Sequence, residues 1–361
     1  MNGTIIPGSS MWPDSRIQQL TQTAAAIFAR APVRFTLIPA SDYYFCDDYA
    51  ADFSAGLDPV FQYVPPKENL TEVDIVLLTS HASDVSHVMW HIRRKFSGDK
   101  LMAAWLWDNH LQHEPNLLTA YASDFVFPSH KYVSDYLVTP NSIPGGHVPL
   151  CCTQWQREQA TSCFEQFRDM PRSDKLLVNY VDYPFSPRTQ LLRALKTQMP
   201  EANVLLMAPN ERSRYYGKTR AERFGEWMEH KCTLILPVDR DLSMRVFDAL
   251  LCGQILLVPS IIPDLDEVIP PAVQTELGII RLEGLQIGVI REATARAVRI
   301  FDEMGSQGVE ARHRYVLENH MMVHRVRTML DRIKSVATGQ TSVIFDGNST
   351  LRYGLHLKDP A

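Results

Sequence analysis

The residues best suited to chemistry lie in the polar loop Asp239–Ser243 and on the helix predicted to follow it, which carries Arg245 and Asp248 on its first two turns. An arginine keeps its charge at physiological pH and can contact two phosphate oxygens at once. An aspartate between apolar residues needs a partner, which could be a ribose diol or a neighbouring basic side chain. The pattern favours a phosphate and ribose site. The alternative for Arg245 is an ordinary solvated surface charge.

The predicted start of this helix adds backbone donors. Leu242, Ser243 and Met244 are placed to offer N–H groups, and the positive end of a helix dipole suits a diphosphate. Asp241 lies at the same junction and is also a candidate donor-binding residue. We therefore expect Asp241, Ser243, Met244, Arg245 and Asp248 to contribute to one binding site.

The flanking segments predict how this junction is positioned. Cys232–Leu236 is a short apolar run closed by Pro237, and Ile255–Val258 is a second such run, so each is typical of a buried strand. Cys252-Gly253 ends the helix between them, with glycine where a left-handed residue is favoured. Strand, loop, helix and strand form a βαβ unit, and parallel sheets bind ligands beyond the carboxyl ends of their strands.

Two further strand ends carry candidate residues. Arg188 opens a predicted helix at Pro187–Gln198, where it could be a second diphosphate contact or an ordinary first-turn residue. In the N-terminal half, Asp108 and His110 follow the strand Leu101–Trp107. His110 could act as the base on an acceptor hydroxyl, and Asp108 could do so if the enzyme inverts; the alternative is a polar loop that caps the next helix.

Composition excludes several classes of protein. The 361 residues are 45% hydrophobic and 21% charged, which is typical of a globular chain long enough for two domains. The net charge of −5 argues against a general nucleic-acid binder. We identify neither a membrane-spanning run nor a signal peptide, and the six scattered cysteines suggest a reducing, cytoplasmic location.

Predicted strands and helices alternate along both halves of the chain. The pattern breaks in a polar segment at 151–174, so we predict domains at 1–155 and 172–335 and a loosely held tail at 336–361. Residues 40–69 are expected to be an irregular insertion, His147–Leu150 a short strand, and Val309–Val336 one continuous helix. His320 and His324 would share a face of that helix, but no HExxH motif accompanies them, so no metal site is expected.

The motifs resemble those of GT-B glycosyltransferases, and in particular the spore-maturation-protein-like group. Asp241–Gly253, DLSMRVFDALLCG, resembles the RxFEAxACG signature of that group, with Asp248 replacing its glutamate. Glu318–Val326 resembles the HTYxxR helix, and Leu177–Arg193 the first strand and helix of the nucleotide domain. The resemblance covers most of 175–335 and reaches the N-terminal half only through the order of elements.

The resemblance implies an α/β fold of two Rossmann-like, doubly wound domains that face one another across a cleft. It also implies a metal-independent, retaining transferase without a cofactor, which moves a sugar from a nucleotide-diphosphate donor to a carbohydrate, lipid-linked or peptide acceptor in glycoconjugate biosynthesis. Peripheral membrane contact would suit a lipid-linked acceptor. Arg240 stands where many retaining enzymes have an acid, which motivates the alternative of a degenerate, non-catalytic binding partner.

Overall fold

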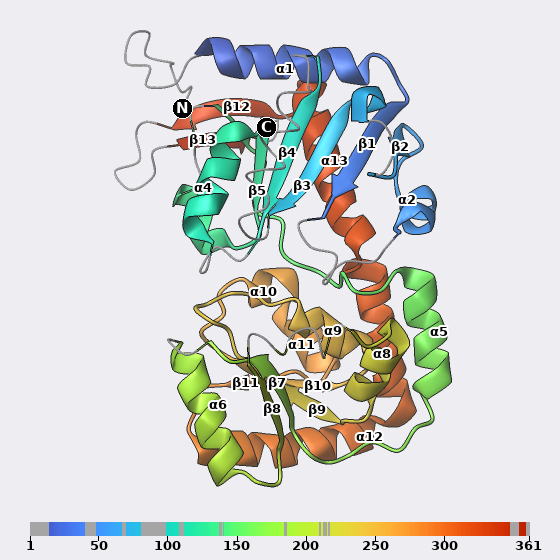
Figure 1. Cartoon of the computed structure of the whole chain (residues 1–361), viewed down its shortest axis with the longest axis vertical. Coiled ribbons are helices and arrows are strands. Elements are labelled where there is room, and N and C mark those ends of the chain that lie inside the picture. The colour runs from blue at the N-terminus through green and yellow to red at the C-terminus, as the bar shows by residue number, and fades with distance from the viewer. Residues whose placement is uncertain are drawn as a thin grey trace. The chain divides into compact units, whose positions relative to one another are not determined.

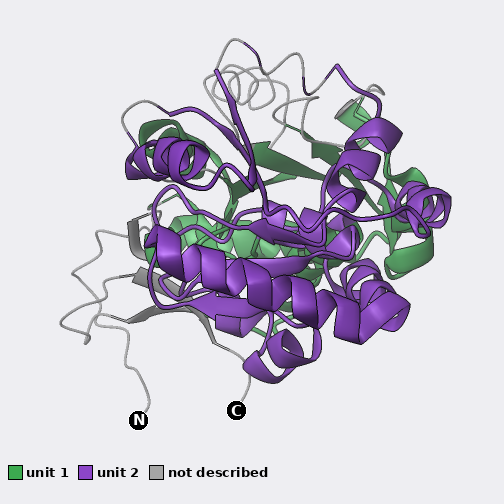
Figure 2. Ribbon diagram, turned by 90° about the horizontal axis from the view of Figure 1, so that it is seen from below, with its two compact units in different colours: residues 1–149, 323–361 green, residues 150–322 purple. Residues whose placement is uncertain are grey.

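A computed structural model of the protein describes residues 14–39, 48–66, 70–80, 99–107, 112–136, 139, 141–183, 186–208, 211, 215, 217–346 and 354–358. The chain divides into two compact units (Figure 2). Unit 1 comprises residues 1–149 and 323–361, and unit 2 comprises residues 150–322. No helix among the described residues is long and apolar enough to cross a membrane.

Unit 1 is built on a six-stranded, wholly parallel sheet of order β2-β1-β3-β4-β5-β6 (Figure 1). Its strands are β1 (Val33–Ile38), β2 (Phe61–Tyr63), β3 (Ile75–Ser80), β4 (Leu101–Leu106), β5 (Phe125–Pro128) and β6 (Ile143–Pro144). Its helices are α1 (Asp14–Phe28), α2 (Ala50–Gly56), the 3₁₀ turns η1 (Leu70–Glu72) and η2 (Lys131–Tyr136), α4 (His113–Ala122) and nearly all of α13 (Met322–Ala337). A hairpin of β12 (Ser342–Asp346) and β13 (Gly354–Lys358) follows α13.

Burial explains why these strands read as continuous apolar runs. Every residue of β4 is buried, as expected for a central parallel strand that is covered on both faces. Val76, Leu78 and Met102 pack into one core cluster, and Ala104 and Leu106 pack into another.

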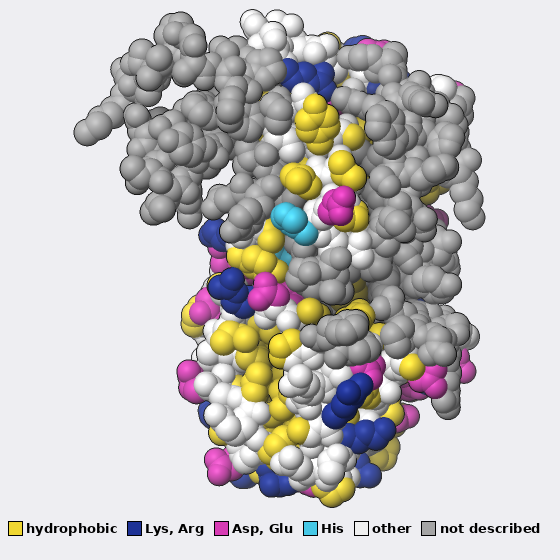
Figure 3. Space-filling model, turned by 60° about the vertical axis from the view of Figure 1, so that its left-hand side comes forward, with side chains coloured by type: hydrophobic (Ala, Val, Ile, Leu, Met, Phe, Trp, Pro, Cys, Tyr) yellow, Lys and Arg dark blue, Asp and Glu magenta, His cyan; other side chains and the backbone are white. Residues whose placement is uncertain are grey.

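By contrast, α4 leaves Leu117, Leu118 and Tyr121 exposed at its surface, with exposed fractions of 40%, 57% and 57%. Hydrophobic, acidic and histidine side chains appear together on this side of the molecule (Figure 3).

The last helix, α13, is held in unit 1 by cations that bind backbone carbonyls. Arg325 donates to the carbonyl of Pro149 at 2.9 Å, and Arg332 donates to those of Gly145 and His147 at 3.0 and 2.9 Å. Lys334 also forms an ion pair with Asp58 at 2.9 Å. The contacts of α13 therefore assign residues 323–335 to unit 1, whereas the sequence placed them in a C-terminal domain at 172–335.

Unit 2 contains a five-stranded parallel sheet of order β11-β10-β9-β7-β8. Its strands are β7 (Leu177–Val181), β8 (Asn203–Met207), β9 (Cys232–Leu234), β10 (Ile255–Pro259) and β11 (Ile280–Leu282). Its helices are α5 (Arg157–Phe167), α6 (Pro187–Gln198), α8 (Arg220–Met228), α9 (Arg245–Leu251), α10 (Leu265–Val268), α11 (Pro271–Glu276) and α12 (Ile287–Asn319). The long α12 packs against β9, β10, β11 and α9.

The two parallel sheets confirm the predicted α/β class with two doubly wound halves. Several local predictions were wrong. The expected insertion 40–69 contains α2 and β2, because Phe53 and Phe61 are buried anchors within an otherwise polar stretch. The polar segment 151–174 contains α5, which buries Ala160, Cys163 and Phe164 on one face. Residues 147–150 form no strand; the short edge strand β6 lies just before them.

The predicted single helix Val309–Val336 is also wrong, because the chain leaves helical geometry at His320. There φ is −134°, and the carbonyl of His320 accepts a hydrogen bond from Cys152 at 2.9 Å instead of continuing the helix. His320 and His324 consequently do not share the face of one helix. Cys152 also pairs with Met321, so the segments that enter and leave unit 2 lie side by side within it.

Gly253 confirms the predicted left-handed helix end and supports a stability prediction. Its φ is +72°, and a Cβ there would lie 2.6 Å from Val309 Cγ1. Gly253→Ala is expected to lower the free energy of unfolding by about 2 kcal/mol, from backbone strain and overpacking together. Gly339→Ala is the matched control, because Gly339 has φ +73° but no described atom within 4 Å of an added Cβ.

Chemical denaturation measures both variants. The control should lose only about 1 kcal/mol, the cost of the left-handed backbone alone. Equal losses for the two variants would contradict the close approach of Val309 to Gly253.

Candidate functional site

In the sheet of unit 2, the order of the strands reverses at one position. β8 lies on one side of β7, and β9, β10 and β11 continue on the other. Sheets of this kind bind ligands beyond the carboxyl ends of the strands at such a switch point. In this unit the switch point is between β7 and β9, which share the single register pair Leu177 and Thr233. The residues that follow these two strands are therefore the first candidates.

Tyr180, near the end of β7, joins the two strands where their backbone pairing has stopped. Its hydroxyl donates to the carbonyl of Leu234 at 2.9 Å and accepts from the N–H of Leu236 at 2.7 Å. The side chain is only 2% exposed, and this burial raises the pKa of its hydroxyl, although Arg245 and Arg188 oppose that rise. The ring is thus fixed across the switch point. Sequence reasoning missed this residue.

Two arginines from different elements converge on the ring of Tyr180. The guanidinium of Arg188, on the first turn of α6, lies 4.8 Å from the ring centroid, and that of Arg245, at the start of α9, lies 4.5 Å from it. Both distances are those of cation–π contacts. Arg188 also lies 5.0 Å from the ring of Tyr183. Two half-buried positive charges therefore gather where the sequence predicted a diphosphate.

Arg188 keeps hydrogen-bonding capacity in this position. One of its terminal nitrogens lies 3.5 Å from the carbonyl of Leu236, a long contact, and its Nε is buried without a partner among the described residues. Burial lowers the pKa of Arg188, and Arg245 lowers it further. An anion placed between the two guanidiniums would satisfy these donors and offset the repulsion between the charges.

The loop before α9 is held by its own aspartate. Asp241 Oδ1 accepts from the N–H groups of Val238 and Asp239 at 2.7 and 3.3 Å. Ser243 accepts from the N–H of Arg245 at 3.4 Å, and Met244 is the residue that precedes the helix. The structure thus gives Asp241 and Ser243 a role in shaping the junction, and their contact with a donor stays a prediction.

Asp248 is buried inside α9, with 1% of its surface exposed. Its Oδ2 accepts from the amide of Gln154 at 2.8 Å, while Oδ1 has no partner among the described residues. Burial raises the pKa of Asp248 to about 6, and Gln154, Arg245, Cys152 and Arg223 each oppose that rise. The predicted need for a partner is confirmed; the partner in the structure is an amide of unit 2, and the ribose contact stays a prediction.

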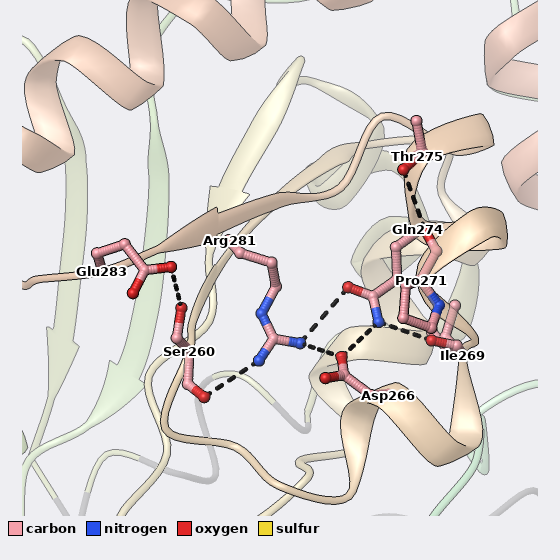
Figure 4. A network of polar contacts seen from close by, with 8 residues as sticks. All are labelled: Ser260, Asp266, Ile269, Pro271, Gln274, Thr275, Arg281 and Glu283. Carbon is pink, nitrogen blue, oxygen red and sulfur yellow. Dashed lines mark hydrogen bonds and ion pairs between the residues drawn. The ribbon is translucent and has the colours of Figure 1, made fainter.

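A polar network fixes the segments that follow β10 and β11, at the same edge of the sheet (Figure 4). Arg281 donates to Asp266 at 2.8 Å and to the carbonyl of Ser260 at 3.2 Å. The hydroxyl of Ser260 donates to Glu283 at 2.9 Å, and Gln274 donates to Asp266 at 2.8 Å. The network links β10, α10, α11 and β11 at their ends, on the same edge of the sheet as the switch point.

The remaining predicted residues are placed as follows. Asp108 and His110, the candidate bases, lie outside the described residues. Arg240 is exposed and lies 3.9 Å from Asp239, so an exposed ion pair occupies the position where an acid was expected. In the part of the chain that the structure describes, no group of histidine, cysteine and acidic side chains could hold a metal ion.

Comparisons with known proteins concern the fold. No protein-family model matches the chain, and no curated protein matches it. Among solved structures, it is similar to sucrose-phosphate synthase from Thermosynechococcus elongatus, with a TM-score of 0.47, 11% identity, and coverage of 90% of this chain and 93% of that one.

Two further structures are similar over a smaller share of the chain. The α,α-trehalose 6-phosphate synthase from Burkholderia multivorans has a TM-score of 0.42 and 12% identity, covering 74% of this chain and 72% of its own. The catalytic domain of starch synthase IV from Arabidopsis thaliana, bound to ADP and acarbose, has a TM-score of 0.44 and 9% identity, covering 74% and 73%. These are GT-B glycosyltransferases, the group that the sequence resembles. At TM-scores below 0.5, only the fold is compared.

Proposed function

We propose that this protein is a glycosyltransferase that binds a nucleotide-diphosphate sugar at the β7–β9 switch point of unit 2. The observation that carries the proposal is the convergence of Arg188 and Arg245 on Tyr180 at this point. Two guanidiniums from separate elements suit the two phosphates of such a donor, because each can bind phosphate oxygens in bidentate fashion. The position is the one where doubly wound sheets bind nucleotides.

The same guanidiniums would assist the reaction. When the sugar leaves the donor, negative charge develops on the terminal phosphate, and fixed positive groups stabilise that charge without reorganising. Two arginines can supply this stabilisation without a metal ion, so we propose transfer without one. Asp248 would contact the ribose, and His110 would act on the acceptor. The proposed acceptor is a carbohydrate, a lipid-linked sugar or a peptide, and we propose retention of anomeric configuration from the family resemblance.

Calorimetric titration of the full chain with UDP, GDP, ADP, CDP and dTDP tests the proposal at its first step. We expect one of these nucleotides to bind at least ten times more tightly than its monophosphate, because the second phosphate adds a charge-assisted contact. Hydrolysis of the matching nucleotide sugar would then identify the transferred group. Failure of all five nucleotides to bind would favour the non-catalytic alternative.

Metal dependence is measured in the assay of nucleotide-sugar hydrolysis. Activity is expected to be unchanged, within about twofold, after dialysis against EDTA, since the charge of the leaving phosphate is balanced by side chains. Loss of activity with EDTA and recovery with magnesium or manganese would show that a metal ion carries this function instead.

A further inference from the structure

Tyr180 contacts both arginines of the proposed site and also the backbone of the neighbouring strand. Its ring centroid lies 4.8 Å from the guanidinium of Arg188 and 4.5 Å from that of Arg245, and its hydroxyl is bonded to both Leu234 and Leu236. The side chain is 2% exposed, and its hydroxyl already donates and accepts a hydrogen bond within the protein. Any effect on a ligand must act through the arginines.

The two positively charged guanidiniums beside this ring would repel one another if nothing offset their charges. The negative face of an aromatic ring attracts a cation by about 0.5–2 kcal/mol, which is enough to restrict where each guanidinium rests. Because both guanidiniums are held to the same ring, the spacing between them is set by the ring and not by two independent flexible side chains. Preorganised donors bind a ligand of matching spacing more tightly, since less side-chain freedom is lost.

We propose that Tyr180 is the positioning residue that holds Arg188 and Arg245 as a matched pair for the two phosphates of a diphosphate. This inference rests on the proposed function and specifies what selects the donor's diphosphate. A single phosphate can satisfy one guanidinium of the pair, whereas a diphosphate spans both. The preference for a diphosphate over a monophosphate therefore depends on the ring that sets their spacing.

The test uses inorganic pyrophosphate and orthophosphate as probes, so that no nucleobase needs to be known. Calorimetry of the wild-type chain is expected to show at least tenfold tighter binding of pyrophosphate, as two charge-assisted contacts replace one. Tyr180→Leu removes the ring, and we expect it to reduce this ratio to about twofold or less, because the guanidiniums lose their shared contact.

Tyr183→Leu is the matched control, since the Tyr183 ring lies 5.0 Å from Arg188 but Tyr183 follows the end of β7, whereas Tyr180 lies within that strand. The control should weaken both probes by a similar factor and leave their ratio within about twofold of the wild-type value. A merely structural role for Tyr180 would lower the melting temperature of Tyr180→Leu without changing the ratio, and that result would overturn the inference.

Ring fluorination keeps the inference testable where Tyr180→Leu does not fold. Phenylalanine and its progressively fluorinated analogues at position 180 keep the shape of the ring while weakening its negative face. We expect pyrophosphate affinity to fall stepwise along this series, by about threefold to tenfold in total, with orthophosphate affinity nearly constant. A flat series would refute the role of the ring.

The outcomes also separate this inference from the proposed function. If the wild type binds pyrophosphate selectively and the ratio falls in the Tyr180 variants, but no nucleotide sugar is hydrolysed, then the positioning role holds and the transferase proposal fails. If a nucleotide sugar is hydrolysed but the Tyr180 variants keep the wild-type ratio, then only the positioning role fails. A wild type that binds neither pyrophosphate nor any nucleoside diphosphate would overturn both.

Discussion

Arg245→Gln is expected to weaken the binding of the preferred nucleoside diphosphate by about 10- to 150-fold, the loss of one hydrogen-bonded charge contact worth about 1.5–3 kcal/mol. Arg188→Gln should have a loss of similar size, because the two guanidiniums lie at nearly equal distances from Tyr180. Glutamine keeps some hydrogen-bonding capacity of the side chain while shortening it and removing its charge. Isothermal titration of each variant with the nucleotide measures the effect.

Arg193→Gln is the matched control for charge removal. Arg193 lies on α6, as Arg188 does, but it is largely exposed and forms an ion pair with Asp182 at 2.9 Å. Its replacement removes the same charge from the same helix and should change nucleotide affinity by less than about threefold, since exposed charges act weakly at a distance in salt. Equal effects of Arg193→Gln and Arg188→Gln would mean that net charge, and not the paired site, attracts the nucleotide.

The two arginines were predictable because each follows a recognisable strand and begins a recognisable helix. Position after a strand is a local property of the sequence, and the carboxyl ends of parallel strands all lie at one edge of a sheet. What joins the two arginines is Tyr180, whose ring is contacted by both and whose hydroxyl reaches β9. That contact depends on the strand order, which places β7 beside β9, and the sequence does not state this order.

Asp248 shows a second way in which a local pattern is incomplete. The sequence required a partner for an aspartate among apolar residues and offered a ribose or a basic side chain. The structure supplies Gln154 from far along the chain, in the polar segment where the predicted alternation of strands and helices breaks. The residues around Gln154 do not predict this contact, because a hydrogen bond between an amide and a carboxylate far apart in the chain has no characteristic spacing in the sequence. Similarly, α5 was hidden because its buried face carries only Ala160, Cys163 and Phe164.

Element ends were predicted less well than elements for a related reason. His320 ends α12 because its carbonyl accepts from Cys152, a tertiary contact that no helical pattern contains. The arginines after this break bind carbonyls of unit 1, so the chain passes from unit 2 to unit 1 at this break. The apolar spacing of Val309–Val336 continues through the break, which is why the sequence read as one helix. Tertiary hydrogen bonds decided the boundary.

The buried carboxyl of Asp248 leads to a prediction about stability in the absence of any ligand. Its pKa is raised from 3.8 to about 6 in the folded protein, mainly by burial. A folded pKa above the unfolded one means that folding favours the protonated carboxyl. The contribution of Asp248 to the free energy of unfolding is therefore fully present at low pH, and it is lost as the pH rises through the folded pKa of about 6. A shift of roughly two units corresponds to about 3 kcal/mol.

Asp248→Asn cannot ionise, so it should be insensitive to this loss. Below about pH 4 the variant and the wild type should have similar free energies of unfolding; above about pH 6 the variant should be more stable by up to about 3 kcal/mol. Gln154 can accommodate the change, because its Oε1 has no partner among the described residues and can accept from the new amide once Gln154 turns over.

Urea denaturation at several pH values measures the free energy of unfolding of the wild type and of Asp248→Asn. The difference between these two free energies reports the titration of Asp248. His313 titrates in the same range with the opposite sign, because burial lowers its pKa to about 4 and its contribution to stability is lost as the pH falls from 6.5. That contribution is common to both proteins and cancels in the difference.

Asp239→Asn provides the control, since it removes an acidic charge from an exposed position in the loop that precedes α9. Its stability relative to the wild type should change by less than about 0.5 kcal/mol between pH 4 and pH 7, as expected for a solvated group. A difference curve for Asp248→Asn that stays flat over this range would show that Asp248 is ionised in the folded protein without penalty. Gln154 and the nearby Arg245 would then fully balance its buried charge, and the carboxylate would be available, already ionised, to accept hydrogen bonds from a ribose.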